Sequence, residues 1–310
     1  MKDVAGIRAT LHAAGYVADE SLATSVFLAL SIGRPLLLEG EPGAGKTSLA
    51  AALAAALQGP LLRLQCYEGI DAAQALYDWD FARQLIDLRR GPAAGEASPG
   101  APLLGTSSLR TPSAGSTEVY SEAYLLERPI LAALRVSRPG RPAVLLIDEI
   151  DRADDEFEAL LLEVLGEWTV TIPEIGTLTA AAPPVVVLTS NRTRELHDAL
   201  RRRCLYHWVE HPSMTVERAI VRRRLPDIDE VLGAQVVEAV HHLRGLGLVK
   251  PPGVAETLDW LRALAALGVR ELDGEAARRT LGAVVKDRDD DAFVRTAGPL
   301  PGGAPPRRPT

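Results

Sequence analysis

The feature that most constrains this chain is the stretch GEPGAGKT, which runs from Gly40 to Thr47. It matches the pattern G-x-x-x-x-G-K-[ST] in full. A short apolar run at 35–38 precedes it, and residues 47–57, rich in alanine and leucine, follow it. A strand before and a helix after are the context in which this pattern forms a phosphate-binding loop. The sequence therefore predicts a nucleotide phosphate site between a buried strand and the start of a helix.

The residue types of this stretch suit phosphate binding. Glycines let consecutive backbone N–H groups turn toward phosphate oxygens without interference from a Cβ atom, and the following helix adds the positive end of its dipole. Lys46 would neutralise phosphate charge, and the Thr47 hydroxyl would ligate Mg²⁺. The predicted nucleotide-binding residues are Gly40, Glu41, Pro42, Gly43, Ala44, Gly45, Lys46, Thr47 and Ser48, together with Asp148.

Two further apolar runs end in polar residues. The run at 144–147 leads into Asp148 and Glu149. Asp148, at a strand tip beside the phosphate loop, would hold Mg²⁺ together with Thr47, and Glu149 would orient and deprotonate the attacking water. The run at 185–188 leads toward Asn191, which could contact the γ-phosphate and that water. The next acids, Asp151, Asp154 and Asp155, are assigned to the N-terminus of the following helix, where acids suit the dipole.

Three consecutive arginines occupy 201–203. They could form a solvent-exposed charged face, which is the usual fate of a charge run. Alternatively, one of them could reach across a subunit interface to the γ-phosphate. Both interpretations stay open. A metal site at Cys204, His207 and His211 is disfavoured, because a strand between them would direct Cys204 and His207 to opposite faces.

The composition limits the classes of function. The 310 residues are 47% hydrophobic and 24% charged, which is ordinary for a globular protein with a core. Acidic residues outnumber basic ones by 41 to 34, whereas proteins that bind nucleic acid through its phosphates usually carry a basic excess.

No apolar run is long enough to span a membrane, and the first residues do not form a signal peptide. Two cysteines specify no disulfide framework. We expect a cytoplasmic protein without a nucleic-acid partner.

The order of expected elements predicts an α/β fold followed by a helical unit. Strands alternate with helices up to about His211, a pattern that indicates βαβ units and a parallel sheet. The pattern at 168–179 predicts a β-hairpin, and 71–89 and 121–136 predict helices. Four helices are expected between 213 and 285. The predicted domains are an α/β nucleotide-binding domain over 1–211 with a disordered loop at 91–116, a helical lid over 212–286, and a disordered tail over 287–310.

Taken together, these motifs resemble the AAA+ ATPases and, within them, the MoxR family. The resemblance covers about 15–285 and depends on GEPGAGKT at 40–47, LLIDEID at 145–151, TSN at 189–191 and ALRRRCLYHW at 199–208. The block LLRLQCYEGIDAAQALYDWDFARQL at 61–85, together with GVAETLDWLRAL at 253–264, is similar to the subgroup found beside molybdenum hydroxylases of the carbon monoxide dehydrogenase type.

The resemblance implies a P-loop core of parallel sheet and flanking helices, followed by a small all-α lid. It implies a ring, hexameric in this family, with ATP and Mg²⁺ bound between subunits. Lys46 and Thr47 would form the Walker A motif, Asp148 and Glu149 the Walker B motif, and Asn191 sensor 1. Arg201 or Arg203 would be the trans-acting arginine finger. The loop at 91–116 and the hairpin at 168–179 would be the family's two insertions, both facing a client.

One stretch departs from the family. Related members carry a sensor 2 arginine at the start of a lid helix, where this chain has Ala255-Glu256-Thr257. Thr257 takes the matching position, and Arg262 follows more than a turn later. The departure concerns how strongly the lid senses the γ-phosphate, and not whether ATP binds.

By resemblance, the expected function is ATP hydrolysis coupled to the remodelling of a protein client. The client would be a metalloenzyme under maturation, of the molybdenum hydroxylase type, and a von Willebrand A-domain protein would be a partner. Two alternatives stay open. A DNA-acting AAA+ motor is disfavoured by the acidic balance. A nucleotide-gated scaffold with little turnover is disfavoured by Glu149 and favoured by the missing sensor 2 arginine.

Overall fold

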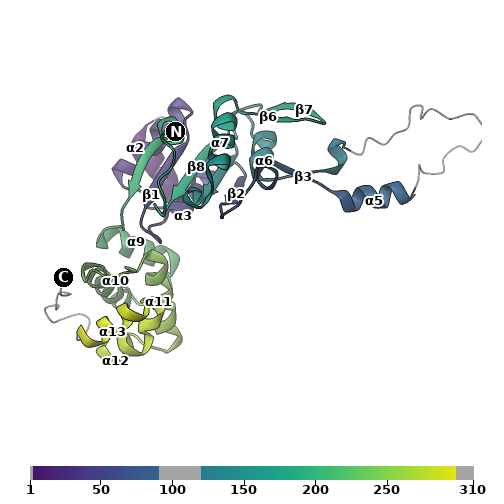
Figure 1. Ribbon diagram of the computed structural model, residues 1–310. Coiled ribbons are helices and arrows are strands. Elements are labelled where there is room, and N and C mark those ends of the chain that lie inside the picture. Colours follow the sequence, from purple (N-terminus) through teal and green to yellow (C-terminus); the bar gives the residue numbers. More distant parts are fainter. Residues whose placement is uncertain (1–2, 91–119, 298–310) are drawn as a thin grey trace, which may run out of the picture.

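A computed structural model describes residues 3–90 and 120–297. Figure 1 shows an α/β part, with a helical part joined to it through α9. The α/β elements are, in chain order, α1 (Val4–Ala13), α2 (Glu20–Ile32), β1 (Leu36–Gly40), α3 (Lys46–Leu57), β2 (Leu61–Gln65), α4 (Ala72–Leu76), β3 (Tyr77–Trp79), α5 (Phe81–Arg90), β4 (Leu125–Glu127), α6 (Pro129–Val136), β5 (Val144–Asp148), α7 (Asp155–Glu167), β6 (Thr169–Ile172), β7 (Gly176–Thr179), β8 (Val185–Ser190), α8 (Asp198–Arg203) and β9 (Leu205–Val209).

The central sheet has five parallel strands in the order β2-β5-β8-β1-β9. Every residue of β1 and of β5 is buried, because helices cover both faces of the sheet, as parallel strands require. The predicted parallel α/β fold is therefore confirmed. In register, Gln65 lies beside Asp148, and Glu39 beside Ser190. The carboxyl ends of β2, β5, β8 and β1 thus meet at one edge, which is where ligands bind in such sheets.

Alternate strand residues pack into two separate layers. Leu36 and Leu38 of β1 pack in the layer that contains α1, α2 and α3, whereas Leu37 packs in the layer that contains α6 and α7. Phe157 of α7 is among the largest side chains buried in the second layer. Burying a leucine or phenylalanine of this kind contributes about 1.5–3 kcal/mol. The leucine-rich strands therefore fix the sheet between its helices.

The helical part contains α9 (Met214–Arg224), α10 (Glu230–Gly245), α11 (Val254–Ala266), α12 (Gly274–Thr280) and α13 (Arg288–Ala297). It has its own core, in which Trp260 is fully buried and its indole Nε1 donates a hydrogen bond to Thr280 Oγ1 at 2.7 Å. Among the described residues, no helix combines the length and the apolar character needed to cross a bilayer.

Part of the predicted disordered tail is a helix. The segment 287–310 was expected to be disordered, yet α13 occupies Arg288–Ala297. The buried carboxylate of Asp290 accepts hydrogen bonds from the backbone N–H groups of Val249 and Lys250, both at 2.9 Å, and Val294 packs in the helical core. The prediction was wrong here because both contacts are tertiary and leave no local pattern.

Two predicted helices are interrupted. The segment 71–89 forms α4, β3 and α5, and 121–136 forms a short 3₁₀ turn, β4 and α6. Strands β3 and β4 pair antiparallel, with Trp79 opposite Leu125. The predicted hairpin at 168–179 is confirmed as β6 and β7. Figure 1 shows this hairpin and the β3–α5 segment extending from the α/β part on the side away from α2. The predicted loop at 91–116 lies outside the described residues.

Candidate functional site

The predicted phosphate loop connects β1 to α3, and its glycines adopt backbone conformations that other residues avoid. Gly43 and Gly45 have φ angles of 75° and 96°, in the left-handed region that favours glycine. A Cβ atom on Gly40 would come within 2.1 Å of the Val209 carbonyl oxygen. The loop therefore requires these three glycines, and its backbone turns around the N-terminus of α3, where amide donors are free of intrahelical partners.

Lys46 is buried inside this loop, with 7% of its surface exposed. Its Nζ donates hydrogen bonds to the carbonyl oxygens of Gly40 at 2.6 Å and Glu41 at 2.9 Å. Burial lowers the pKa of the Lys46 ammonium, and nearby carboxylates, Asp151 first among them, oppose this shift. The loop thus holds a cation at its centre, which suits an anionic polyphosphate.

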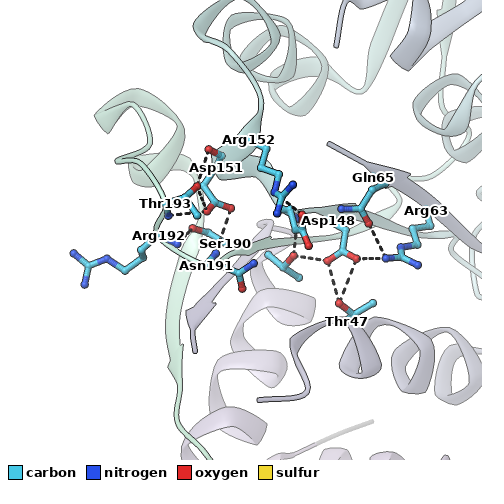
Figure 2. Close-up of polar contacts among 12 residues, drawn as sticks. Thr47, Arg63, Gln65, Asp148, Asp151, Arg152, Ser190, Asn191, Arg192 and Thr193 are labelled. Atoms are coloured by element: carbon cyan, nitrogen blue, oxygen red, sulfur yellow. Dashed lines mark hydrogen bonds and ion pairs between the residues drawn. The ribbon is translucent and has the colours of Figure 1, made fainter. Parts of the chain in front are cut away.

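Thr47 and Asp148 lie together, 101 residues apart in the sequence. The Thr47 hydroxyl lies 3.0 Å from Asp148 Oδ1 and 3.3 Å from Oδ2, and the Thr189 hydroxyl donates to Oδ1 at 2.5 Å (Figure 2). The Asp148 side chain is only 5% exposed. Hydroxyl and carboxylate oxygens are the hard donors that Mg²⁺ prefers. The donor set at this point therefore fits a magnesium ion.

Glu149 has a φ angle of 56°, which is uncommon for a residue other than glycine and marks a constrained position. Its backbone N–H donates to Thr189 Oγ1 at 3.0 Å. Its carboxylate forms an ion pair with Arg152 Nε at 2.7 Å, a contact that the sequence did not indicate. Glu149 and Asn191 line the same cavity as Thr47 and Asp148. The four predicted side chains thus come together at one site.

The sequence-based role of Asp151 was wrong. It was assigned to the N-terminus of α7, but Asp154 caps that helix by accepting from the Phe157 N–H at 2.9 Å. Asp151 is buried and accepts from the N–H groups of Asn191 at 3.2 Å and Thr193 at 2.8 Å, and from the Thr193 hydroxyl at 2.7 Å (Figure 2). Asp151 therefore fixes the loop that carries Asn191, a contact between two loops that no local pattern reveals.

The phosphate loop opens into a cavity of about 1170 Å³ between the α/β part and the helical part. This volume exceeds the roughly 300–1,000 Å³ typical of small-ligand sites. Besides the loop, the cavity is lined by Tyr16, Val17, Ile220 and Leu258, which the sequence did not single out, and by His211, which the sequence analysis considered only in a disfavoured metal site. Both ring nitrogens of His211 are buried without a hydrogen-bond partner among the described residues. Burial and the neighbouring Arg244 lower the pKa of His211, so the imidazole is neutral near pH 7.

The helical part contacts the phosphate loop directly. The Val254 N–H at the start of α11 donates to the Gly43 carbonyl oxygen at 3.1 Å. A Cβ atom on Gly253 would come within 2.7 Å of Gly43 Cα. Glu256 completes the turn by accepting from the Gly253 N–H at 3.0 Å. Two glycines thus allow the backbone at the start of α11 to meet the backbone of the phosphate loop.

Thr257, which was expected at the sensor 2 position, does not face the cavity. It is fully buried, and its hydroxyl donates to Glu217 Oε1 at 2.6 Å. The face of α11 that lines the cavity carries Ala255, Leu258 and Arg262 instead, with Val254. The helical period turns Thr257 about 100° from its neighbour Leu258, which directs its hydroxyl to Glu217 and not into the cavity.

The three arginines at 201–203 separate rather than forming one charged face. Arg201 lies 3.9 Å from the buried Glu39 carboxylate, with its guanidinium over the Tyr206 ring. Arg202 is largely exposed near Asp198, and Arg203 donates to the Leu162 carbonyl. None of the three lines the cavity of its own chain.

Comparisons with known proteins agree with this geometry. The family model described as AAA domain (dynein-related subfamily) matches residues 35–204. An uncharacterized protein of Staphylococcus haemolyticus is 23% identical over 289 residues, covering 90% of this chain and 95% of the relative. One of Staphylococcus saprophyticus is 22% identical over 286 residues, covering 89% and 94%.

Solved structures with detectable similarity include two bacterial proteins. A mutant form of Thermotoga maritima RuvB has a TM-score of 0.49 and 16% identity, covering 91% of this chain and 77% of that one. A Cytophaga hutchinsonii protein described as an ATPase has a TM-score of 0.47 and 14% identity, covering 93% and 90%.

Proposed function

The chain belongs to the family of AAA domains, in its dynein-related subfamily, and from this premise we propose that its ATP hydrolysis drives the remodelling of a protein client. The protein is an ATPase that uses ATP and Mg²⁺. We expect it to work in the cytoplasm, where ATP is supplied. The observation that carries the site assignment is the hydrogen bond between Thr47 and Asp148, which joins the phosphate loop to the end of β5.

The proposed chemistry follows from the positions of five side chains. Lys46 and the amides of the loop bind the phosphates, and Thr47 and Asp148 hold Mg²⁺. When bound, the metal neutralises charge that develops on the phosphates. Glu149 accepts a proton from the attacking water, and Asn191, on the loop fixed by Asp151, orients that water. The ion pair with Arg152 engages Oε2 of the Glu149 carboxylate, and the second oxygen can accept the proton because a carboxylate offers two acceptor atoms.

The cavity also has side chains that suit a nucleoside. Val17, Ile220 and Leu258 provide apolar surface for a base. A neutral imidazole has one donor and one acceptor nitrogen, and both nitrogens of His211 lack a partner in the described structure. A buried polar group without a partner calls for an explanation, and a purine with hydrogen-bonding edges supplies one.

The arginine finger is proposed to act between subunits of a ring, expected to be hexameric. Arg201 and Arg203 are the candidates, on α8 (Asp198–Arg203). Because neither lines the cavity of its own chain, a role at the nucleotide requires a neighbouring copy. The Arg201 side chain is 38% exposed, which leaves part of its guanidinium available to that copy.

For the client, we propose a metalloenzyme of the molybdenum hydroxylase type, acting with a von Willebrand A-domain protein. The support is the resemblance of 61–85 and 253–264 to the associated subgroup. Part of this block forms α5, which carries Phe81, Leu85 and Ile86 with more than half of each side chain exposed. Exposed apolar groups on one helix are typical of protein contact.

Phosphate release by the wild type and by Glu149→Gln tests the proposed reaction. The variant keeps the phosphate loop and the magnesium ligands, so it should bind ATP with wild-type affinity. Loss of the base should slow hydrolysis by about 10²-fold or more. Equal, near-zero rates in both proteins would favour a nucleotide-gated scaffold instead.

The client is tested with the same variant. Glu149→Gln, loaded with ATP, should co-elute with a purified molybdenum hydroxylase of this type and its von Willebrand A-domain partner. The complex should dissociate when ADP replaces ATP. Co-elution that is absent, or that is independent of the nucleotide, would contradict this part of the proposal.

A further inference from the structure

Each of the two acids after β5 has an arginine beside it. Arg152, which pairs with Glu149, comes from the same turn of chain. Arg63, which pairs with Asp148, comes from a different strand, 85 residues away, and its Nη2 lies 2.5 Å from Asp148 Oδ2 (Figure 2). Arg63 therefore places a positive charge directly on the carboxylate proposed to hold Mg²⁺.

The strand pairing explains how Arg63 reaches this carboxylate. It lies on β2, an edge strand, whose neighbour is β5. Leu64 packs in the core layer of α6 and α7, so Arg63 and Gln65 project to the opposite face, where α3 lies. Gln65 is the register partner of Asp148, and Arg63 Nη2 also donates to Gln65 Oε1 at 2.7 Å. The guanidinium is thus held between an amide and a carboxylate.

The fold does not depend on this contact. Without Arg63, the Asp148 carboxylate keeps its hydrogen bonds from Thr47 and Thr189. The Arg63 side chain is 53% exposed, whereas that of Asp148 is 5% exposed. An exposed guanidinium can leave its partner for water at little cost. The fold therefore tolerates the replacement of Arg63 but not that of the buried Asp148.

We propose that Arg63 is a positioning residue that competes with Mg²⁺ for Asp148 and thereby sets how strongly metal binding is coupled to nucleotide binding. Two cations on one carboxylate repel each other, so Arg63 weakens the binding of the metal. Without metal, Arg63 neutralises Asp148 and reduces the repulsion between that carboxylate and the phosphates. Arg63 therefore increases the affinity for nucleotide in the absence of metal. It also reduces the increase in this affinity that metal binding produces. This inference rests on the proposed role of Asp148.

The test is a ratio of two dissociation constants for a non-hydrolysable ATP analogue, both measured by calorimetry. The ratio is the constant in EDTA divided by the constant in excess Mg²⁺. This ratio reports the coupling between the two ligands. Arg63→Met removes the charge and keeps the apolar stem, and it should raise the ratio by up to about fivefold and by more than about twofold, the size expected for one ion pair of this exposure. Arg63→Lys keeps the charge and should stay within about twofold of the wild type.

The control is Arg128→Met, because the Arg128 side chain is 45% exposed, close to the 53% of Arg63, and it pairs with Asp78 on another part of the surface. It should leave the ratio unchanged. A merely structural role of Arg63 would weaken both affinities alike and also leave the ratio unchanged, which would overturn the inference. A lower ratio in Arg63→Met, or a lysine variant that behaves like the methionine variant, would overturn it as well. A wild type that binds the analogue equally in EDTA and Mg²⁺ would refute the proposed role of Asp148 itself.

Discussion

At the scale of single residues, the site contains buried polar atoms that the fold alone does not satisfy. The clearest case is His211, whose two ring nitrogens are buried and lack hydrogen-bond partners in the described structure. A native protein leaves few such groups unpaired, because each costs about 1–3 kcal/mol. A ligand that pairs with them recovers this free energy on binding.

We predict that His211→Phe weakens the binding of ATP about tenfold, the equivalent of one hydrogen bond to a buried partner. The binding of inorganic tripolyphosphate should not change, because that ligand lacks the base that His211 is proposed to bind. Competition binding with both ligands measures the two effects. His12→Phe, on the exposed face of α1, is the matched control. Equal weakening of ATP and tripolyphosphate would show that His211 only supports the loop.

At the scale of elements, local patterns were sufficient where a segment's neighbours in sequence decide its structure. The apolar runs of β1, β5 and β8 and the alanine-rich α3 form as predicted, because burial and helix propensity act within each segment. The segment 71–89 does not form one helix, because β3 pairs with β4, a strand about 50 residues later. Its helical propensity was outweighed by a pairing that only the tertiary fold supplies.

The junction between α11 and the phosphate loop leads to a prediction at this scale. A methyl group on Gly253 would contact Gly43 Cα at 2.7 Å, and backbone at that distance must shift. Gly253→Ala should therefore push the lid helix from the loop, break the bond from the Val254 N–H to the Gly43 carbonyl, and weaken nucleotide binding about tenfold, as the loss of one such bond implies.

The matched control is Gly274→Ala on α12, where a Cβ atom meets nothing within 4 Å. Calorimetry of the ATP analogue measures both variants, and thermal unfolding verifies that both fold. If Gly253→Ala binds as tightly as Gly274→Ala, the contact between lid and loop does not contribute to nucleotide binding.

At the scale of the whole molecule, the sequence identified the phosphate end of the site and missed the rest. Lys46 and Thr47 begin α3, whereas Asp148, Glu149 and Asn191 stand at or just after strand ends, and all five have recognisable local signals. The rest of the cavity is assembled from the segments around Tyr16, His211 and Leu258, which are distant in sequence and carry no shared pattern. The inward position of Asp151 and the contact of Arg63 with Asp148 are likewise tertiary.

The assembly gives a further prediction. If the finger acts in trans, one of the two variants, Arg201→Ala or Arg203→Ala, should bind ATP normally and hydrolyse it about 10³-fold more slowly. The variant that shows this loss identifies the finger. Mixing that variant with Glu149→Gln should restore hydrolysis at about a quarter of interfaces in randomly mixed rings. Phosphate release from the mixture measures this. No recovery on mixing would contradict a site shared between subunits.

The central claim is that the loop from Gly40 to Thr47 binds the phosphates of ATP around Lys46, with Mg²⁺ held between Thr47 and Asp148. The most direct measurement is calorimetric titration of wild type and Lys46→Ala with a non-hydrolysable ATP analogue in Mg²⁺. Because the buried ammonium is the cation at the centre of the loop, the variant should bind at least about 100-fold more weakly, as the loss of a charge-assisted contact implies, while thermal unfolding shows it still folded. A folded Lys46→Ala protein that binds the analogue within about threefold of wild type would contradict the account.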